Sequence, residues 1–124
     1  MNDPEVIMRN VPNTNALIAH QKALEAAGTA IKLSMKVSAP LKPIADQVIR
    51  SASSVPANLA EGHGRVGRDR VHLWRIAYAS AKEVDSHLRL LTAAGAVDRT
   101  AANSSLDGFD EVRAMTWRLL NPKS

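Results

Sequence analysis

The chain has 124 residues, enough for one domain to bury a core without disulfides or a structural metal. It contains no cysteine, which excludes thiolate catalysis, disulfides and cysteine-based zinc sites. Lys and Arg number 16 against 12 Asp and Glu, and the resulting net charge of +4 favours polyanionic partners over acidic ones.

Residues 1–15 are predicted to form a flexible N-terminal tail, and residues 16–124 a four-helix bundle domain. The tail contains Pro4, Pro12 and several asparagines, a composition that sustains neither a helix nor a strand. The N-terminus lacks a basic region followed by an apolar run, and no later apolar stretch approaches the roughly 20 residues that span a bilayer. We therefore expect a cytoplasmic protein that does not contact a membrane.

The first helix is expected from Ala16 to about Val37, because large apolar residues and alanines recur there at helical spacing. Its predicted apolar stripe comprises Leu17, Leu24, Ala27, Ile31 and Met35. Gly28 lacks a side chain and would permit close contact with another helix. Pro40 and Pro43 end this helix and begin the next.

The second helix is expected from about Ile44 to Glu61 and carries two stripes at steps of three or four residues. The apolar stripe comprises Ile44, Val48, Ala52, Val55 and Leu59, and the polar stripe comprises Gln47, Arg50, Ser54, Asn58 and Glu61. Gly62 is expected to close the helix as a left-handed residue. A helix with two such stripes packs on neighbours along two faces.

The third helix is expected from about Arg68 to Ala94, where Gly95 stops it. Its apolar stripe comprises Val71, Trp74, Ala77, Ala81, Val84, Leu88 and Leu91. This is the longest predicted element.

Asp98 or Thr100 is expected to cap a fourth helix, which ends before Pro122. Its apolar face comprises Leu106, Phe109, Val112, Thr116 and Leu119. No segment alternates apolar and polar residues, so a sheet is not expected. The pattern predicts an all-α fold, an antiparallel up-down-up-down four-helix bundle.

Motifs on the second and third helices are similar to a known family. They read DQVIRSA at 46–52, SVPANLAEG at 54–62, GR at 64–65 and IAYASAKEV at 76–84. The chain resembles, over about Leu17 to Leu120, the four-helix-bundle family named for proteins encoded in intervening sequences of bacterial 23S ribosomal RNA genes. The resemblance implies a homo-oligomeric ring of five subunits. It also implies a link to accessory proteins of diversity-generating retroelements, which bind nucleic acid and a reverse transcriptase.

The polar stripe of the second helix is expected to face Ser80, Glu83 and His87 on the third, which have the same spacing. One interpretation is a hydrogen-bonded layer that fixes helix register or a subunit contact. The alternative is a hydrolase in which Glu61 and Glu83 act as an acid and base pair. A bundle of this size offers little concave pocket, which favours the structural layer and a protein that is not an enzyme.

Two pairs of residues have a spacing that suits metal ligands. Asp69 and His72 are three residues apart, and Glu83 and His87 are four apart, so each pair shares a helix face. A di-iron bundle needs a Glu from each of two helices and a Glu-x-x-His pair from each of the others, which this chain lacks. We expect no metal and no cofactor.

The densest positive cluster comprises Arg65, Arg68, Arg70 and Arg75, with Asp69 as its single acid. Lying at the loop and first turns of the third helix, it is expected to bind phosphates. The alternative is that these arginines pair with carboxylates of a neighbouring subunit, such as Glu61 or Asp98. In a ring each cluster would be repeated, and weak phosphate contacts would add through multivalency.

These features favour a non-enzymatic, ring-forming bundle that binds RNA or DNA through its phosphates. Aromatic residues form only 3% of the chain, so a platform that stacks successive unpaired bases is not expected. The alternative is a protein-interaction scaffold that does not bind nucleic acid, with Trp74 and Trp117 as anchors. A reverse transcriptase is the protein partner that the family resemblance implies.

Overall fold

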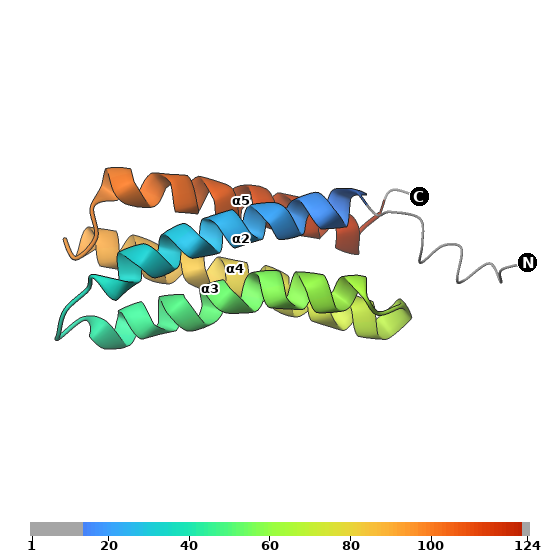
Figure 1. Cartoon of the computed structure of the whole chain (residues 1–124), viewed down its shortest axis with the longest axis horizontal. Coiled ribbons are helices and arrows are strands. Elements are labelled where there is room, and N and C mark those ends of the chain that lie inside the picture. Colours follow the sequence, from blue (N-terminus) through green and yellow to red (C-terminus); the bar gives the residue numbers. More distant parts are fainter. Residues whose placement is uncertain (1–13, 123–124) are drawn as a thin grey trace, which may run out of the picture.

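A computed structural model describes residues 14–122, which form four α-helices and no strand (Figure 1). The helices are α2 (Thr14–Met35), α3 (Lys42–His63), α4 (Gly67–Ala93) and α5 (Arg99–Leu120). Each predicted helix is present, with ends within two residues of those expected. Because α2 begins at Thr14, the last two residues of the predicted tail are helical, and the rest, residues 1–13, lies outside the described residues.

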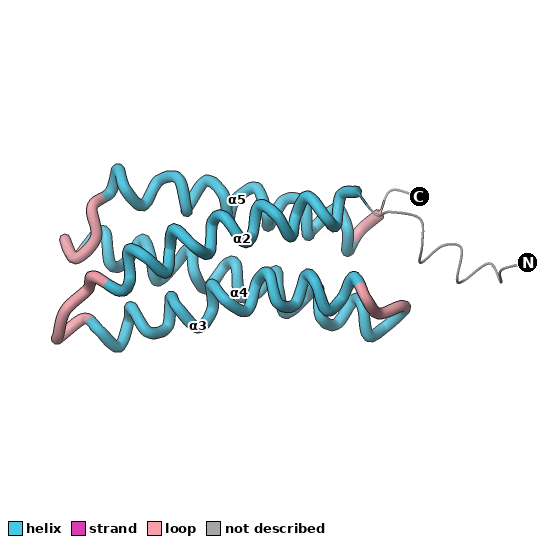
Figure 2. Tube along the Cα trace, in the orientation of Figure 1, coloured by secondary structure: helices cyan, strands magenta, loops and turns pink. Residues whose placement is uncertain are grey.

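The four helices lie side by side along the long axis of the molecule. The α2–α3 and α4–α5 loops lie at one end, and the α3–α4 loop lies at the other (Figure 2). Helix α2 packs against α3 and α5, and α4 packs against the same two helices. This arrangement encloses one core between the four helices.

Helices α3, α4 and α5 bury the stripes that their sequences predict. The residues of those stripes that are buried are Val48, Ala52, Val55, Leu59, Trp74, Ala77, Ala81, Val84, Leu88, Leu91, Leu106, Phe109, Val112 and Thr116. The hydroxyl of Thr116 is satisfied by donating to the Val112 carbonyl at 2.7 Å. The core of these three helices is therefore readable from helical periodicity alone.

The prediction of which side of α2 is buried was wrong. This helix buries a row of small residues, Ala16, Ala19, Ala23, Ala26, Ala27, Ala30 and Ser34, and only Ala27 belongs to the predicted stripe. Leu17, Leu24 and Met35 are 51%, 47% and 72% exposed. No atom lies within 4 Å of a Cβ added at Gly28, so this glycine makes no close contact within the described chain.

Close packing between α2 and α5 explains why alanine, not leucine, fills this side of the core. A Cβ added at Gly108 would lie 2.9 Å from the Cβ of Ala26. The buried hydroxyl of Ser105 donates to the Ala26 carbonyl at 2.8 Å, which ties the two backbones together. Larger side chains on this face of α2 would force the helices apart, so the leucines lie outside.

The turn between α4 and α5 has the chemistry that the sequence predicts. Gly95 adopts a φ of +79°, and the N–H of Ala96 donates to the Leu91 carbonyl at 2.9 Å, as in a Schellman motif. The Asp98 side chain then accepts a hydrogen bond from the Ala101 N–H at 2.9 Å. Of the two predicted caps, Asp98 is the one used.

Gly62 does not close α3 as a left-handed residue, which corrects the prediction. The helix continues to His63, and the positive φ angles among the described glycines are at Gly67 and Gly95. A Cβ at Gly62 would instead lie 2.5 Å from Cδ1 of Trp74. Glycine is needed here because the indole of α4 packs directly on the α3 backbone.

Candidate nucleic-acid interface

Arg70, one of the four arginines in the predicted phosphate cluster, is used inside the protein. From the first turns of α4 its guanidinium donates to the carbonyls of Gly62 and His63, at 3.1 and 3.0 Å. Both carbonyls lie at the end of α3; that of Gly62 also accepts from the Arg65 N–H at 3.1 Å, whereas that of His63 has Arg70 as its partner within the described residues. The guanidinium also lies 5.3 Å from the ring centroid of Trp74, whose indole N–H donates to the Leu59 carbonyl at 3.3 Å. Arg70 therefore fixes the α3–α4 corner.

Arg65 is also partly neutralised within the chain. Its guanidinium lies 3.3 Å from the Glu61 carboxylate and 3.8 Å from that of Asp69. All three side chains are exposed, so these ion pairs contribute at most about 1 kcal/mol to stability. They nevertheless reduce the charge that Arg65 offers to an external anion.

Arg68 and Arg75 remain open to solvent. Both are exposed on α4, and neither makes an ion pair with a residue in the described range. They lie seven residues apart, which is two helical turns and about 10 Å along one face. The positive charge of the predicted cluster is therefore concentrated on this face of α4.

Lys82 extends the same face by another two turns and was missed in the sequence analysis. It is exposed, and its ammonium lies 5.9 Å from the ring centroid of Tyr78, with no ion pair among residues 14–122. Arg68, Arg75 and Lys82 thus form a row of three cations, which we name the α4 basic face. The i, i+7, i+14 spacing is the sequence signal that could have found it.

The predicted polar layer forms only in part. Ser80 donates its hydroxyl hydrogen to Ser54 Oγ at 2.9 Å, and the Asn58 amide donates to the same oxygen at 3.0 Å. The Asn58 amide also bonds the Ser54 carbonyl at 2.8 Å. These three half-buried residues join α3 to α4.

The remaining members of the predicted layer lie outside this contact. Arg50, Glu61 and Glu83 are exposed, and Gln47 is half-buried without a side-chain hydrogen bond to any residue in 14–122. Glu61 pairs with Arg65 rather than with Glu83. The two glutamates of the alternative hydrolase are thus both exposed, and neither lines the pockets between α2 and α5 or between α4 and α5.

The two pairs of residues whose spacing suits metal ligands do not form a metal site within the described residues. No three His, Asp or Glu side chains in the range 14–122 come together in a way that could hold a metal ion. The Nδ1 atom of His87 is buried and has no hydrogen-bond partner in this range. Nothing in the surroundings of His87 identifies a ligand for it.

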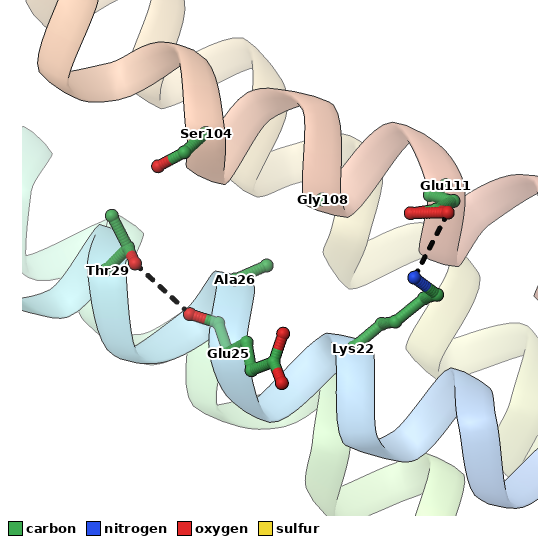
Figure 3. Close-up of a pocket in the computed structure, with 7 residues that line it drawn as sticks. All are labelled: Lys22, Glu25, Ala26, Thr29, Ser104, Gly108 and Glu111. Carbon is green, nitrogen blue, oxygen red and sulfur yellow. Dashed lines mark hydrogen bonds and ion pairs between the residues drawn. The ribbon is translucent and has the colours of Figure 1, made fainter.

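One pocket lies between α2 and α5, with a volume of about 230 Å³ (Figure 3). Its residues are Lys22, Glu25, Ala26, Thr29, Ser104, Gly108 and Glu111. The Lys22 ammonium is 3.1 Å from the Glu111 carboxylate, and the Thr29 hydroxyl donates to the Glu25 carbonyl at 3.2 Å. With its lysine already paired and a second carboxylate present, this pocket is poorly suited to bind an anion.

A second pocket, of about 350 Å³, lies between α4 and α5 beside the α4 basic face. We name it the Trp117 groove; its residues are Tyr78, Asp110, Arg113, Ala114, Trp117 and Arg118. The rings of Tyr78 and Trp117 have centroids 6.2 Å apart and planes tilted by 47°. From sequence, Trp117 is expected only as an anchor for a protein partner, and no sequence pattern places these residues together.

The two arginines of the Trp117 groove differ in how far carboxylates neutralise their charge. Arg113 lies 2.7 Å from the Asp110 carboxylate and 3.8 Å from that of Asp85. Asp85 also binds Arg89 at 2.8 Å, and this hydrogen bond raises the pKa of the Arg89 guanidinium above its ordinary value. Arg118, in contrast, is exposed and has no ion pair within the described range.

Comparison with known proteins decides the family. The model of the 23S rRNA-intervening sequence protein family matches residues 15–118, which include all of α3 and α4 and nearly all of α2 and α5. The chain belongs to this family. The α4 basic face and Trp117 both lie within the matched residues.

A solved structure of the S23 ribosomal protein family is similar to this family member. It is a protein of unknown function from Bacteroides thetaiotaomicron VPI-5482, with a TM-score of 0.78 and 23% identity, covering 86% of this chain and 98% of that protein. At this identity the similarity establishes the fold alone. No curated protein matches the sequence.

Across residues 14–122, every helix is too short or too polar to cross a bilayer.

Proposed function

We propose that this member of the 23S rRNA-intervening sequence protein family is a non-enzymatic, cytoplasmic, ring-forming antiparallel bundle that binds RNA or DNA through backbone phosphates. The observation that carries the proposal is the α4 basic face. Arg68, Arg75 and Lys82 repeat about every 10 Å along one helix and lack carboxylate partners within residues 14–122. The site is thus narrower than the four-arginine cluster, because Arg65 and Arg70 already bind groups of the protein.

Such a surface would bind without reading sequence. Contacts between cationic side chains and phosphates release counterions, so affinity falls steeply as salt rises. Flexible exposed side chains contact the backbone of either nucleic acid, and base edges are not required. We therefore expect similar affinity for RNA and DNA of unrelated sequence.

Ring formation is supported by the exposed side of α2, which does not face the core. Leu17 and Leu24 are about half exposed and lie on one side of the helix with the open Gly28. Exposed apolar residues aligned along a helix are a typical surface for contact between protein chains. In a ring of five subunits, the α4 basic face would be present five times and its weak contacts would add.

The direct test compares two triple variants of equal net charge. R68A/R75A/K82A removes the α4 basic face, and K32A/K36A/K42A removes three lysines near the α2–α3 loop. Binding to fluorescein-labelled RNA and duplex DNA is measured by anisotropy over a salt series. The first variant should lower the slope of log K against log salt by about one for each lost contact, and the second should not.

If both triple variants lost the same affinity and the same slope, net charge alone would account for binding and the proposed site would be wrong. If the wild type retained no nucleic acid at low salt but captured a purified reverse transcriptase or another protein in a salt-insensitive way, the scaffold alternative would replace the proposal.

A further inference from the structure

Trp117 is unusually exposed for a tryptophan in a small bundle. It is 54% exposed, whereas the other tryptophan, Trp74, is 4% exposed. Its indole N–H has no hydrogen-bond partner among residues 14–122. Tyr78 supports one side of the ring and leaves the rest of the indole accessible, so an aromatic surface opens into the groove between α4 and α5.

Unpaired positive charge lies beside this aromatic surface. Arg118 shares the groove with Trp117, and Lys82 lies over the ring of Tyr78. Asp110, the carboxylate that lines the groove, lies 2.7 Å from Arg113, which also forms an ion pair with Asp85 at 3.8 Å. The groove therefore combines one accessible ring with Arg118, and Lys82 lies outside it over Tyr78; neither cation has an ion pair in the described range.

The volume of the groove suits a small planar ligand. It has a volume of about 350 Å³ and is largely open to solvent, so a flat ring can lie across it without being enclosed. Three of its six residues are charged, namely Asp110, Arg113 and Arg118, so it is a poor receptor for an apolar protein side chain. A flat ring that carries a negative charge on its attached group matches these features best.

We propose that the Trp117 groove binds an unpaired nucleobase of single-stranded RNA or DNA, which stacks on Trp117 while its phosphates contact Arg118 and Lys82. This inference rests on the proposed function, because Lys82 of the α4 basic face lies over Tyr78, a residue that lines the groove. A strand held along α4 by its phosphates reaches Trp117 beside Tyr78. Bases inside a duplex are stacked on one another and do not offer a free face.

The site holds a single base, not a row of them. Of the other aromatic residues, Trp74 and Phe109 are buried and Tyr78 packs on Trp117. This agrees with the expectation from composition that successive bases have no stacking platform. The consequence is a preference for single strands superimposed on binding that is otherwise sequence-tolerant.

The test uses the full chain and three fluorescein-labelled probes of equal length: a mixed-sequence single strand, the same backbone without bases, and a duplex. The wild type should bind the single strand more tightly than the abasic strand by roughly 5- to 150-fold, the range typical of one stacked base. W117A should remove this difference, and W117F should keep most of it. L90A, which removes an equally exposed apolar side chain outside the groove, should have no effect.

A second readout follows Trp117 directly. Stacking should quench the intrinsic fluorescence of the wild type on addition of the single strand, and W117F, which retains the buried Trp74, should show no such change. The salt slope should be the same for wild type and W117A, because no phosphate contact is lost. Circular dichroism and mass in solution of W117A establish that fold and assembly are intact.

The outcomes separate this inference from the function on which it rests. Equal binding of normal and abasic strands, with a normal salt slope, would overturn base stacking and leave phosphate binding in place. No retention of any probe at low salt would overturn the proposed function and this inference with it. A changed mass for W117A would identify Trp117 as a contact between copies or with another protein, and would also overturn the inference.

Discussion

Arg68 and Arg70 lie two residues apart at the start of α4 but serve different purposes. Arg70 binds the Gly62 and His63 carbonyls and stacks on Trp74, whereas Arg68 is exposed. We predict that R70A lowers the free energy of unfolding by about 1–3 kcal/mol, because two charge-assisted hydrogen bonds are lost and the His63 carbonyl is left unpaired. R68A should change it by less than about 0.5 kcal/mol. Urea unfolding of both variants measures the difference.

Nucleic-acid binding should show the reverse order for the same two variants. R68A should lower the salt slope by about one, and R70A should leave it unchanged where the protein remains folded. Equal effects of the two substitutions on both stability and slope would contradict the assignment of separate purposes.

Glycines at positions 28 and 62 provide a second matched pair. We predict that G62A destabilises the protein by about 1–3 kcal/mol, because the new Cβ would lie 2.5 Å from Cδ1 of Trp74 and the indole would have to move. G28A should stabilise the monomer by up to about 1 kcal/mol, because nothing occupies that space and alanine favours the helix. Thermal unfolding measures the stability of both variants, and a G62A variant as stable as the wild type would contradict the account.

At this scale the sequence located the charges but not their partners. The run from Arg65 to Arg75 is visible as a basic cluster, yet only tertiary structure shows that Arg70 reaches back to α3. Lys82 lies seven residues beyond the arginine cluster along the chain and joins it only along one face of the helix. Tyr78 and Trp117 are 39 positions apart on different helices, and no periodicity joins them.

At the scale of the helices, the start of α5 is stabilised by a side-chain cap. Asp98 caps α5 by accepting from the Ala101 N–H. We predict that D98A costs about 1 kcal/mol of unfolding free energy, and that D98N, which can still cap, costs much less. Chemical denaturation compares the two, and an equal loss for both variants would show that the cap contributes nothing specific.

The four helices differ in how well the sequence predicts their buried faces. In α3, α4 and α5 the large apolar residues are the buried ones, so helical periodicity finds the core. In α2 the larger side chains mark the exposed side, because the Ser105 and Gly108 side of α5 approaches so closely that only alanines fit. A prediction that assigns the largest apolar side chains to the buried face fails wherever two helices pack through small residues.

At the scale of the whole molecule, we predict that charged substitutions of the exposed leucines of α2 change the number of subunits. L17E/L24E places two carboxylates on the open face and should reduce a ring, with five times the chain mass of 13.4 kDa, to single chains. L90E, on another exposed leucine, should leave the mass unchanged. Light scattering after size exclusion measures both. Dissociation by L90E and not by L17E/L24E would move the subunit contact away from α2.

The central claim is that this bundle binds nucleic-acid phosphates through the α4 basic face, and retention across a salt series tests it most directly. Purified wild-type protein is applied to mixed-sequence RNA and duplex DNA, with the mass in solution measured on the same sample. The account predicts binding to both polymers by an oligomer, with affinity that falls linearly in log salt and a smaller slope for R68A/R75A/K82A. Failure of an intact oligomer to retain either polymer at low salt would contradict the account.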